Sequence, residues 1–200
     1  MKKIISLFKR DYTGTRTVYN EIVAGAEWVQ DGEGISTVKI DGTSCLVKDG
    51  NLYKRYDAKN GKTPPDGFIP AQDPDPITGH WPGWIIVGDG PQDKWHREAF
   101  AKSQFENEST YELIGPKIQG NPYGLEQHVL IKHGAWLFEN EPPRTFDGLR
   151  DFFEKEKVEG IVWHRGNGDM VKIKRRDFGF EWPTSGASRA IKTIAKVAVV

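Results

Sequence analysis

Five short segments of this chain set a lysine, an arginine, two carboxylates and a pair of lysines beside apolar, strand-like residues. In chain order, the segments are Val38-Lys39-Ile40-Asp41-Gly42, Tyr53-Lys54-Arg55-Tyr56, Tyr111-Glu112-Leu113-Ile114-Gly115, Glu159-Gly160-Ile161-Val162-Trp163 and Val171-Lys172-Ile173-Lys174. A neutral amine is a nucleophile, carboxylates bind divalent cations and hydroxyl groups, and cations neutralise phosphates. The five segments together hold the groups that phosphoryl-transfer chemistry requires.

Each of these residues, taken alone, also has an ordinary explanation. Lys39 alone is typical of a solvated lysine at the end of a strand. Lys172 and Lys174 alternate with apolar residues, which places both lysines on one face of a strand, normally the wet face. Glu112 and Glu159 each adjoin an apolar run, as charges on an edge strand do. The combination and the order, rather than any single residue, therefore point to a common site.

Two hairpins must position several of these residues. Residues 44–48 and 51–56 are strand-like and are joined by Asp49-Gly50, a strong signal for a type I′ turn. Residues 159–164 and 170–174 are also strand-like, and a polar, glycine-containing loop joins them.

The remaining elements are a further strand and a small number of helices. Residues 110–114 predict a strand that ends at Gly-Pro. Apolar spacing predicts a helix over 145–157 with Thr145 as its N-cap, and a weaker pattern marks a helix at 96–105. The tail at 188–200 is compatible with a helix or with a frayed end. Because strands dominate without regular helix alternation, we predict an α+β fold with antiparallel sheets.

The composition indicates a folded chain with a sizeable core. Of the 200 residues, 37% are hydrophobic and 12% are aromatic, which excludes disorder for the bulk of the chain. The net charge of zero argues against a histone-like nucleic-acid binder. Cys45 is the only cysteine, so no intramolecular disulfide or cysteine metal cluster can form. We predict one domain over 1–200, with a loop-rich insertion at about 62–83 and a basic tail at about 184–200.

The sequence predicts an intracellular, cytoplasmic protein with no targeting signal and no membrane partner. The apolar run near the N-terminus stops at Lys9-Arg10, short of the roughly 7–15 residues of a signal-peptide core. Nothing approaches the roughly 20 apolar residues that cross a bilayer. The five histidines show no metal-ligand spacing, and of these only His164, directly after the fourth segment, merits a functional test.

The five segments resemble, in order, motifs I, Ia, III, IV and V of the covalent nucleotidyltransferase superfamily, which contains ATP-dependent RNA and DNA ligases and capping guanylyltransferases. Longer strings narrow the resemblance. They are Lys39-Ile40-Asp41-Gly42-Thr43, Gly79-His80-Trp81-Pro82-Gly83-Trp84, Asn121-Pro122-Tyr123-Gly124-Leu125, His133-Gly134-Ala135-Trp136, Glu159-Gly160-Ile161-Val162-Trp163-His164 and Gly179-Phe180-Glu181-Trp182-Pro183. From Thr37 to Pro183 the chain closely resembles the vertebrate-type 5′-to-3′ RNA ligase family.

The resemblance implies a nucleotidyltransferase (adenylation) domain of antiparallel sheets flanked by helices. It implies ATP as the cofactor, with AMP becoming covalently attached to Lys39, and Mg²⁺ or Mn²⁺ as the metal. The implied partner is RNA with 5′-phosphate and 3′-hydroxyl ends. Only 26 residues follow Lys174, too few for a five-stranded OB-fold, so we expect no C-terminal OB-fold. Joining of RNA ends, as in RNA repair, is then favoured over clamping of a nick.

The resemblance also assigns catalytic roles along the chain. Lys39 is the nucleophile, Asp41 and Gly42 form the turn behind it, and Arg55 grips a ribose or the RNA terminus. An ordinary lysine, with a pKa of about 10.4, is protonated at neutral pH and cannot attack. The resemblance therefore requires a site that favours the neutral amine. Neighbouring lysines and a bound metal are the expected cause.

Nucleotide-binding roles follow from the same resemblance. Glu112 hydrogen-bonds the ribose hydroxyls, Glu159 holds the metal directly or through water, and Lys172 and Lys174 contact the α-phosphate. Trp136 stacks on the adenine, with Phe138 as the alternate; a core role is equally compatible with either ring.

One position departs from the pattern. Many DNA ligases carry a glutamate two residues before the lysine to read adenine, and here that residue is Thr37. A preference for ATP over GTP therefore rests on the resemblance alone. The alternatives are a DNA ligase, a GTP-dependent capping-type enzyme, or a catalytically idle module that binds RNA ends. An excess of basic residues from Arg165 to the C-terminus suits either nucleotide or RNA phosphates, or a solvated basic helix.

Overall fold

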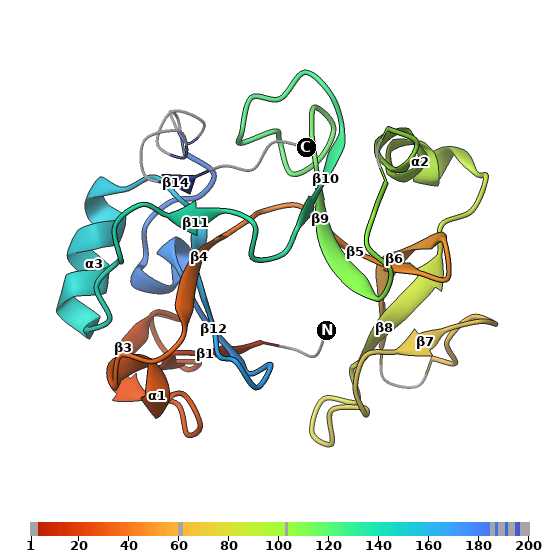
Figure 1. Cartoon of the computed structure of the whole chain (residues 1–200). Coiled ribbons are helices and arrows are strands. Elements are labelled where there is room, and N and C mark those ends of the chain that lie inside the picture. Colours follow the sequence, from red (N-terminus) through yellow and green to blue (C-terminus); the bar gives the residue numbers. More distant parts are fainter. Residues whose placement is uncertain are drawn as a thin grey trace. The chain divides into compact units, whose positions relative to one another are not determined.

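The computed structural model describes residues 4–59, 62–102, 104–184, 187, 191, 195 and 196. The chain divides into two compact units (Figure 1). Unit 1 is the continuous stretch Asp41–His133, and unit 2 combines Ile4–Ile40 with the described residues from Gly134 onward. The chain therefore passes from unit 2 to unit 1 directly after Ile40 and returns after His133.

Unit 2 is built around a six-stranded sheet with the order β1-β13-β12-β4-β11-β14. Its elements are β1 (Ile5–Ser6), β2 (Phe8–Arg10), β3 (Val18–Ile22), α1 (Glu27–Gln30), β4 (Ile35–Lys39), β11 (Leu137–Phe138), α3 (Phe146–Lys155), β12 (Gly160–His164), β13 (Met170–Lys174), η2 (Arg175–Phe178) and β14 (Ala195–Lys196). Strands β2 and β3 form a separate antiparallel pair. In the large sheet β1 pairs with β13 in parallel, whereas β12 pairs antiparallel with both β4 and β13.

Helix α3 contributes its apolar face to the core of unit 2. Leu149 and Phe153 are fully buried, and the Phe146 ring meets Phe8 edge-on at 5.1 Å between centroids. The Thr145 side chain accepts a hydrogen bond from Gly148 N at 3.3 Å, which makes it the N-cap as predicted. The predicted helix is therefore confirmed, although it ends at Lys155 instead of residue 157.

Unit 1 contains a second six-stranded sheet, fully antiparallel, with the order β10-β9-β5-β6-β8-β7. Its elements are β5 (Thr43–Lys48), β6 (Asn51–Ala58), β7 (Ile69–Pro70), β8 (Trp81–Ile86), η1 (Pro91–Asp93), α2 (Lys94–Phe100), β9 (Ser109–Ile114) and β10 (Val129–Lys132). The turn between β5 and β6 has positive φ at both Asp49 (50°) and Gly50 (73°), as a type I′ turn requires. The first predicted hairpin is thereby confirmed.

Two predicted boundaries in unit 1 are wrong. The helix predicted at 96–105 begins at Lys94 and ends at Phe100. The Phe105 ring instead stacks on Phe100 at 5.2 Å and meets Tyr111 edge-on, so tertiary packing turns the chain back where spacing alone continued the helix.

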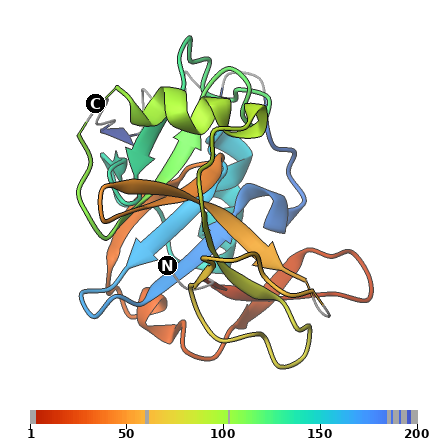
Figure 2. The same ribbon diagram turned by 90° about the vertical axis from the view of Figure 1, so that its right-hand side faces the viewer.

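The segment 62–83 consists mostly of loops and turns, with short pieces of strand. It contains β7, and its last residues, from Trp81, belong to β8, which pairs with β6 (Figure 2). Pro82 is compatible with this strand because its carbonyl faces the β7 side of β8, where it accepts from Ala71 N at 3.0 Å. The Trp84 side chain is fully buried and anchors the strand.

The α+β class with mainly antiparallel sheets is therefore confirmed. One nucleotidyltransferase domain over 1–200 stays a prediction. Most of the predicted tail at 184–200 lies outside the described residues, but Ala195–Lys196 form β14 against β11 rather than part of a helix. In the described part of the chain, no helix is long and apolar enough to span a bilayer.

Candidate active site

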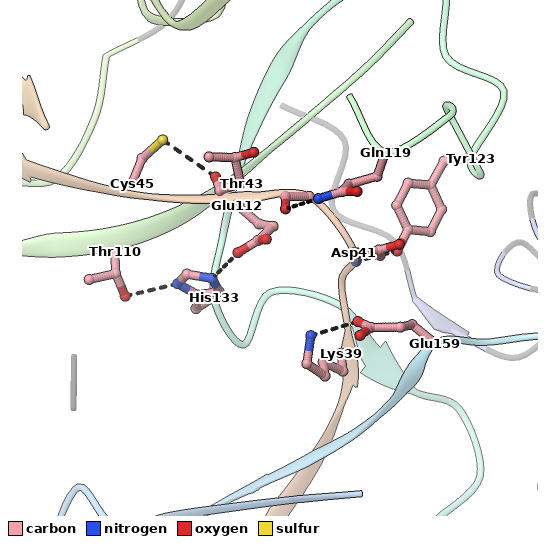
Figure 3. Close-up of polar contacts among 11 residues, drawn as sticks. Lys39, Asp41, Thr43, Cys45, Thr110, Glu112, Gln119, Tyr123, His133 and Glu159 are labelled. Carbon is pink, nitrogen blue, oxygen red and sulfur yellow. Dashed lines mark hydrogen bonds and ion pairs between the residues drawn. The ribbon is translucent and has the colours of Figure 1, made fainter. Parts of the chain in front are cut away.

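Lys39 and Glu159 lie side by side at the ends of adjacent strands in unit 2. Lys39 is the last residue of β4, and Glu159 directly precedes β12. The Lys39 Nζ donates a hydrogen bond to Glu159 Oε2 at 2.6 Å (Figure 3). The side chains are 21% and 9% exposed, so the pair is partly shielded from water. Partial shielding strengthens the pair relative to an ion pair at the surface.

Gly160 permits the close approach of strands behind this pair. A Cβ atom on Gly160 would lie 2.4 Å from the backbone oxygen of Ile173 on β13, which is far inside van der Waals contact. The sequence therefore needs glycine here for strand packing. Its φ is not in the left-handed region, so the requirement comes from space and not from a turn.

Lys172 and Lys174 face the same side of the sheet as Lys39. In the register of the sheet, Lys39 is opposite Gly160, and Gly160 is opposite Lys174. Residues directly opposite one another in antiparallel strands point to the same face. The three positions therefore form one row across β4, β12 and β13, and glycine leaves the middle of the row without a side chain. Lys172 lies on the same face, because alternate residues of a strand share a face.

In β13, apolar residues and lysines were predicted to point to opposite faces, and the burial of their side chains confirms this. Val171 and Ile173 are buried in the core, whereas Lys172 and Lys174 are half-buried. After Lys174 the strand ends in η2, where Lys174 N donates to Asp177 Oδ2 at 2.8 Å. The end of β13 is thus fixed by a hydrogen bond, which sets the position of Lys174 along the row.

The proximity of several amines changes the electrostatics of the cluster. The pKa of Lys172 is lowered to about 8, first by burial and then by the positive charges of Lys174 and Lys39, against the opposing effect of Glu159. A face that concentrates cations in partial shielding from water suits an anionic ligand such as a phosphate.

Thr37 and His164 lie on the same face of the unit 2 sheet. The Thr37 Oγ1 is 2.9 Å from His164 Nε2, and it also contacts the Val162 carbonyl at 3.3 Å. Thr37 stands where many DNA ligases carry a glutamate. Its hydroxyl is therefore held by β12, the strand of the fourth segment. The one histidine that sequence reasoning singled out is its partner.

Trp136 lies next to β4, where its carbonyl accepts a hydrogen bond from Val38 N at 2.8 Å. Its side chain is 4% exposed. Phe138 on β11 packs edge-on against Phe152 of α3 at 6.0 Å between centroids, which is a core contact. Stacking of Trp136 on a base stays a prediction.

Unit 1 holds the third-motif carboxylate, Glu112, on β9. His133 Nε2 lies 2.8 Å from Glu112 Oε2, and its other ring nitrogen lies 2.9 Å from Thr110 Oγ1 (Figure 3). The backbone N–H of His133 also donates to the Thr110 carbonyl at 3.0 Å. Glu112 is therefore oriented by a histidine that sequence reasoning passed over. The available signal was its place in the string His133-Gly134-Ala135-Trp136.

The turn residues Asp41 and Gly42 begin unit 1. The backbone N–H of Asp41 donates to the Tyr123 hydroxyl at 2.6 Å. A Cβ on Gly42 would lie 2.2 Å from the Leu113 carbonyl of β9, and the φ of Gly42 is outside the left-handed region. The chain bends at Gly42, as expected, although the bend needs no left-handed φ. Close approach to β9 is the physical reason for this glycine.

Arg55 lies on β6 of unit 1, with its guanidinium 5.0 Å above the Trp84 ring. Burial lowers the pKa of Arg55, and the carboxylate of Asp57 opposes this shift. An arginine so far from titration at neutral pH stays cationic, as a phosphate-binding role needs.

The donors near Glu159 fit one kind of metal site. Within the described residues, no group of three or more His, Cys, Asp or Glu side chains gathers. Mg²⁺ commonly takes one or two protein carboxylates and completes its shell with waters and substrate phosphates. A cation held by Glu159 together with a bound nucleotide fits this donor set, whereas a cage made of protein ligands does not.

Sequence comparisons relate the chain to one group of proteins. Residues 100–198 match the family described as RNA ligase 1. RNA ligase 1 of Pongo abelii is 31% identical over 223 aligned positions, which cover 74% of this chain and 68% of that protein. RNA ligase 1 of Danio rerio is 28% identical over 251 positions, covering 88% and 77%. The protein of the same name from Mus musculus is 29% identical over 223 positions, covering 74% and 68%.

Proposed function

Because the chain belongs to the RNA ligase 1 family, we propose that it is an ATP-dependent RNA ligase that works through AMP attached to Lys39. The observation that supports this most is the row formed by Lys39, Gly160 and Lys174, with Glu159 bound to the Lys39 amine. The proposed nucleophile and the proposed phosphate-binding cation lie on strands there, and the carboxylate directly precedes one. Such preorganisation is what phosphoryl-transfer catalysis depends on.

In the first step the neutral Lys39 amine attacks the α-phosphorus of ATP. The Nζ–P bond forms, the bond to pyrophosphate breaks, and the proton that the amine loses passes to solvent. The carboxylate of Glu159 is in hydrogen-bond contact with this amine and orients it. Lys172 and Lys174 neutralise charge on the α-phosphate. When Mg²⁺ or Mn²⁺ is bound, Glu159 would hold it directly or through water, and the ion would neutralise phosphate charge.

The next two steps transfer AMP and join the RNA. The 5′-phosphate of an RNA end attacks the phosphorus of the lysyl-AMP, and Lys39 leaves as an amine. A 3′-hydroxyl then attacks the activated 5′-phosphate, AMP leaves, and a phosphodiester bond remains. RNA repair is the role that joining of such ends supports.

Roles for unit 1 residues and for Trp136 follow from the family resemblance. We propose that Glu112 accepts hydrogen bonds from the ribose hydroxyls of the nucleotide, that Arg55 contacts the RNA terminus or a ribose, and that Trp136 stacks on adenine. His133 keeps one oxygen of Glu112 in place. A carboxylate held in this way accepts hydroxyl protons without first reorganising.

Labelling of the protein with ATP tests the first step. Incubation with α-labelled ATP and Mg²⁺ is expected to label the wild-type chain, to leave Lys39→Ala unlabelled, and to label Lys9→Ala as well as wild type. Lys9 is a matched control because it is an exposed lysine of unit 2 that pairs with Glu21 on a neighbouring strand. Label on the Lys39→Ala protein would refute the assignment of the nucleophile.

Assays with different nucleotides and nucleic acids distinguish the alternative functions. Labelling by GTP instead of ATP would favour a capping-type enzyme, and sealing of DNA but not RNA would favour a DNA ligase. Binding of RNA ends without labelling and without sealing would favour an idle binding module. The proposed function predicts labelling by ATP and sealing of 5′-phosphate and 3′-hydroxyl RNA.

A further inference from the structure

Unit 1 contains a cavity of about 330 Å³ on the side of its sheet that carries Arg55. Its lining residues come from β6, from the start of β8 and from the segment that connects β7 to β8. It is lined by Arg55, Asp57, Gln72, Asp75, His80 and Pro82. The proposed reaction assigns a role to Arg55 and none to the other five residues.

The cavity wall is held by contacts within the connecting segment. The Trp81 indole donates to the Gln72 carbonyl at 2.8 Å, and the Phe68 ring packs edge-on against Trp81 at 5.2 Å. Asp75 Oδ1 accepts from the backbone N–H groups of Ile77 and Thr78 at 3.0 and 2.9 Å. These contacts give the segment a defined backbone, so the cavity is formed before any ligand binds.

The lining combines one cation, Arg55, with hydrogen-bond acceptors. The Arg55 guanidinium is fixed above the Trp84 ring. On the neighbouring part of β6, Asp57 Oδ2 lies 3.0 Å from His80 Nδ1, and both side chains are about half exposed to the cavity and solvent. A ligand that fits this lining carries an anionic group for Arg55 and a neutral hydroxyl donor for Asp57.

We propose that this cavity binds one ribonucleotide of the RNA substrate, with its phosphate on Arg55 and its 2′-hydroxyl donating to Asp57. The proposal rests on the proposed function for the identity of the substrate. The 2′-hydroxyl is the group that distinguishes RNA from DNA, and a carboxylate accepts its proton strongly. His80 is a positioning residue, because its contact with one oxygen of Asp57 fixes the direction of the carboxylate.

A scan of single 2′-deoxy substitutions around the RNA break tests the proposal. Each ribose near the break is replaced in turn, and the sealing rate and the RNA dissociation constant are measured. A lost hydrogen bond to a charged group corresponds to roughly a 10- to 100-fold loss. Wild type is expected to show such a loss at one position. In Asp57→Ala, deoxy and ribo substrates should perform alike at that position.

Two further variants complete the experiment. Asp57→Asn preserves the shape of the side chain and should reduce the sensitivity to 2′-deoxy substitution without removing it. Asp73→Ala is the control, because Asp73 is an exposed carboxylate of the same segment that does not line the cavity. It should keep the full sensitivity of wild type.

The outcomes separate this proposal from the proposed function. Absence of ATP-dependent labelling in wild type would refute the proposed function, and the binding scan would still report on the cavity. Labelling and sealing with no sensitive position would refute the cavity proposal alone. The same holds if Asp57→Ala keeps the sensitivity of wild type.

Discussion

At the residue scale, the chemistry depends on how a few side chains are held. The Lys39 amine and the Glu159 carboxylate come from positions 120 residues apart, and neighbouring strands bring them to 2.6 Å. Glu112 is likewise held at 2.8 Å by His133. Lys39 and Glu112 sit on strands, and Glu159 and His133 each adjoin the end of a strand, so the sheets constrain these side chains. Geometry of this kind lowers the reorganisation that a reaction requires.

His133 should matter through Glu112. In His133→Ala the Glu112 carboxylate loses its partner, so the KM for ATP in the labelling reaction should rise by about tenfold or more, with a smaller effect on kcat. His133→Gln restores a donor and should recover part of the loss. An unchanged KM in His133→Ala would show that the histidine does not position Glu112.

The pKa of Lys172 predicts a dependence of stability on pH. It is lowered to about 8 in the folded chain, against an ordinary value of 10.5 in the unfolded chain. Between these values the unfolded chain binds more protons, so Lys172 makes the folded state more stable as pH rises from about 8 to 10.5.

Urea unfolding measures this effect. The difference in unfolding free energy between wild type and Lys172→Met should shift in favour of wild type by up to about 1.4 kcal/mol per pH unit across that window. Taking the difference cancels groups that titrate equally in both proteins. A difference that stays constant with pH would mean that burial does not perturb Lys172.

The sequence pointed to the proposed site residues more readily than to the residues that contact them. Glu112, Glu159 and the lysine pair each stand in a recognisable local string, so their types and order were enough to propose them as site residues. The contact of His133 with Glu112 depends on how the residue after β10 aligns with β9. Cross-strand alignment is a tertiary property that a local pattern does not contain.

At the element scale, strand register decides which side chains meet. The antiparallel pairing of β12 with β4 and β13 places Lys39, Gly160 and Lys174 in one row. A shift of one residue in either pairing would turn a lysine to the opposite face. The two hairpins were predictable because turn and strand signals are local. The pairing of β4 with β12 was not, because it joins segments far apart in the chain.

Gly160→Ala should disturb this row. Its new Cβ would meet the Ile173 carbonyl at 2.4 Å, and backbone cannot move away as a flexible side chain can. We expect the unfolding free energy to fall by roughly 1–3 kcal/mol and ATP labelling to weaken. Urea titration measures the first effect and the labelling assay the second.

Gly166→Ala provides the matched control for that experiment. A Cβ at Gly166 meets no heavy atom within 4 Å, and its φ is not in the left-handed region. The variant should keep both stability and labelling. If Gly160→Ala behaves like Gly166→Ala, close packing of β12 on β13 is not what positions the lysines.

At the scale of the whole molecule, the net charge does not reveal how the charged side chains are distributed. The net charge is zero, yet Lys39, Lys172 and Lys174 gather on one face of the unit 2 sheet. The α+β class followed from the sequence because strands outnumber helices. The division into two units did not, because unit 2 is assembled from stretches on both sides of Asp41–His133. Short sequence patterns do not predict which segments pair when they lie so far apart in the chain.

The measurement that tests the central claim most directly is mapping of the adenylyl group on the intact chain. The protein is incubated with ATP and Mg²⁺, digested, and analysed by mass spectrometry. The account predicts one AMP on the peptide that contains Lys39, removed when RNA with a 5′-phosphate is added. AMP on a different residue, or AMP on Lys39 that RNA ends do not discharge, would contradict it.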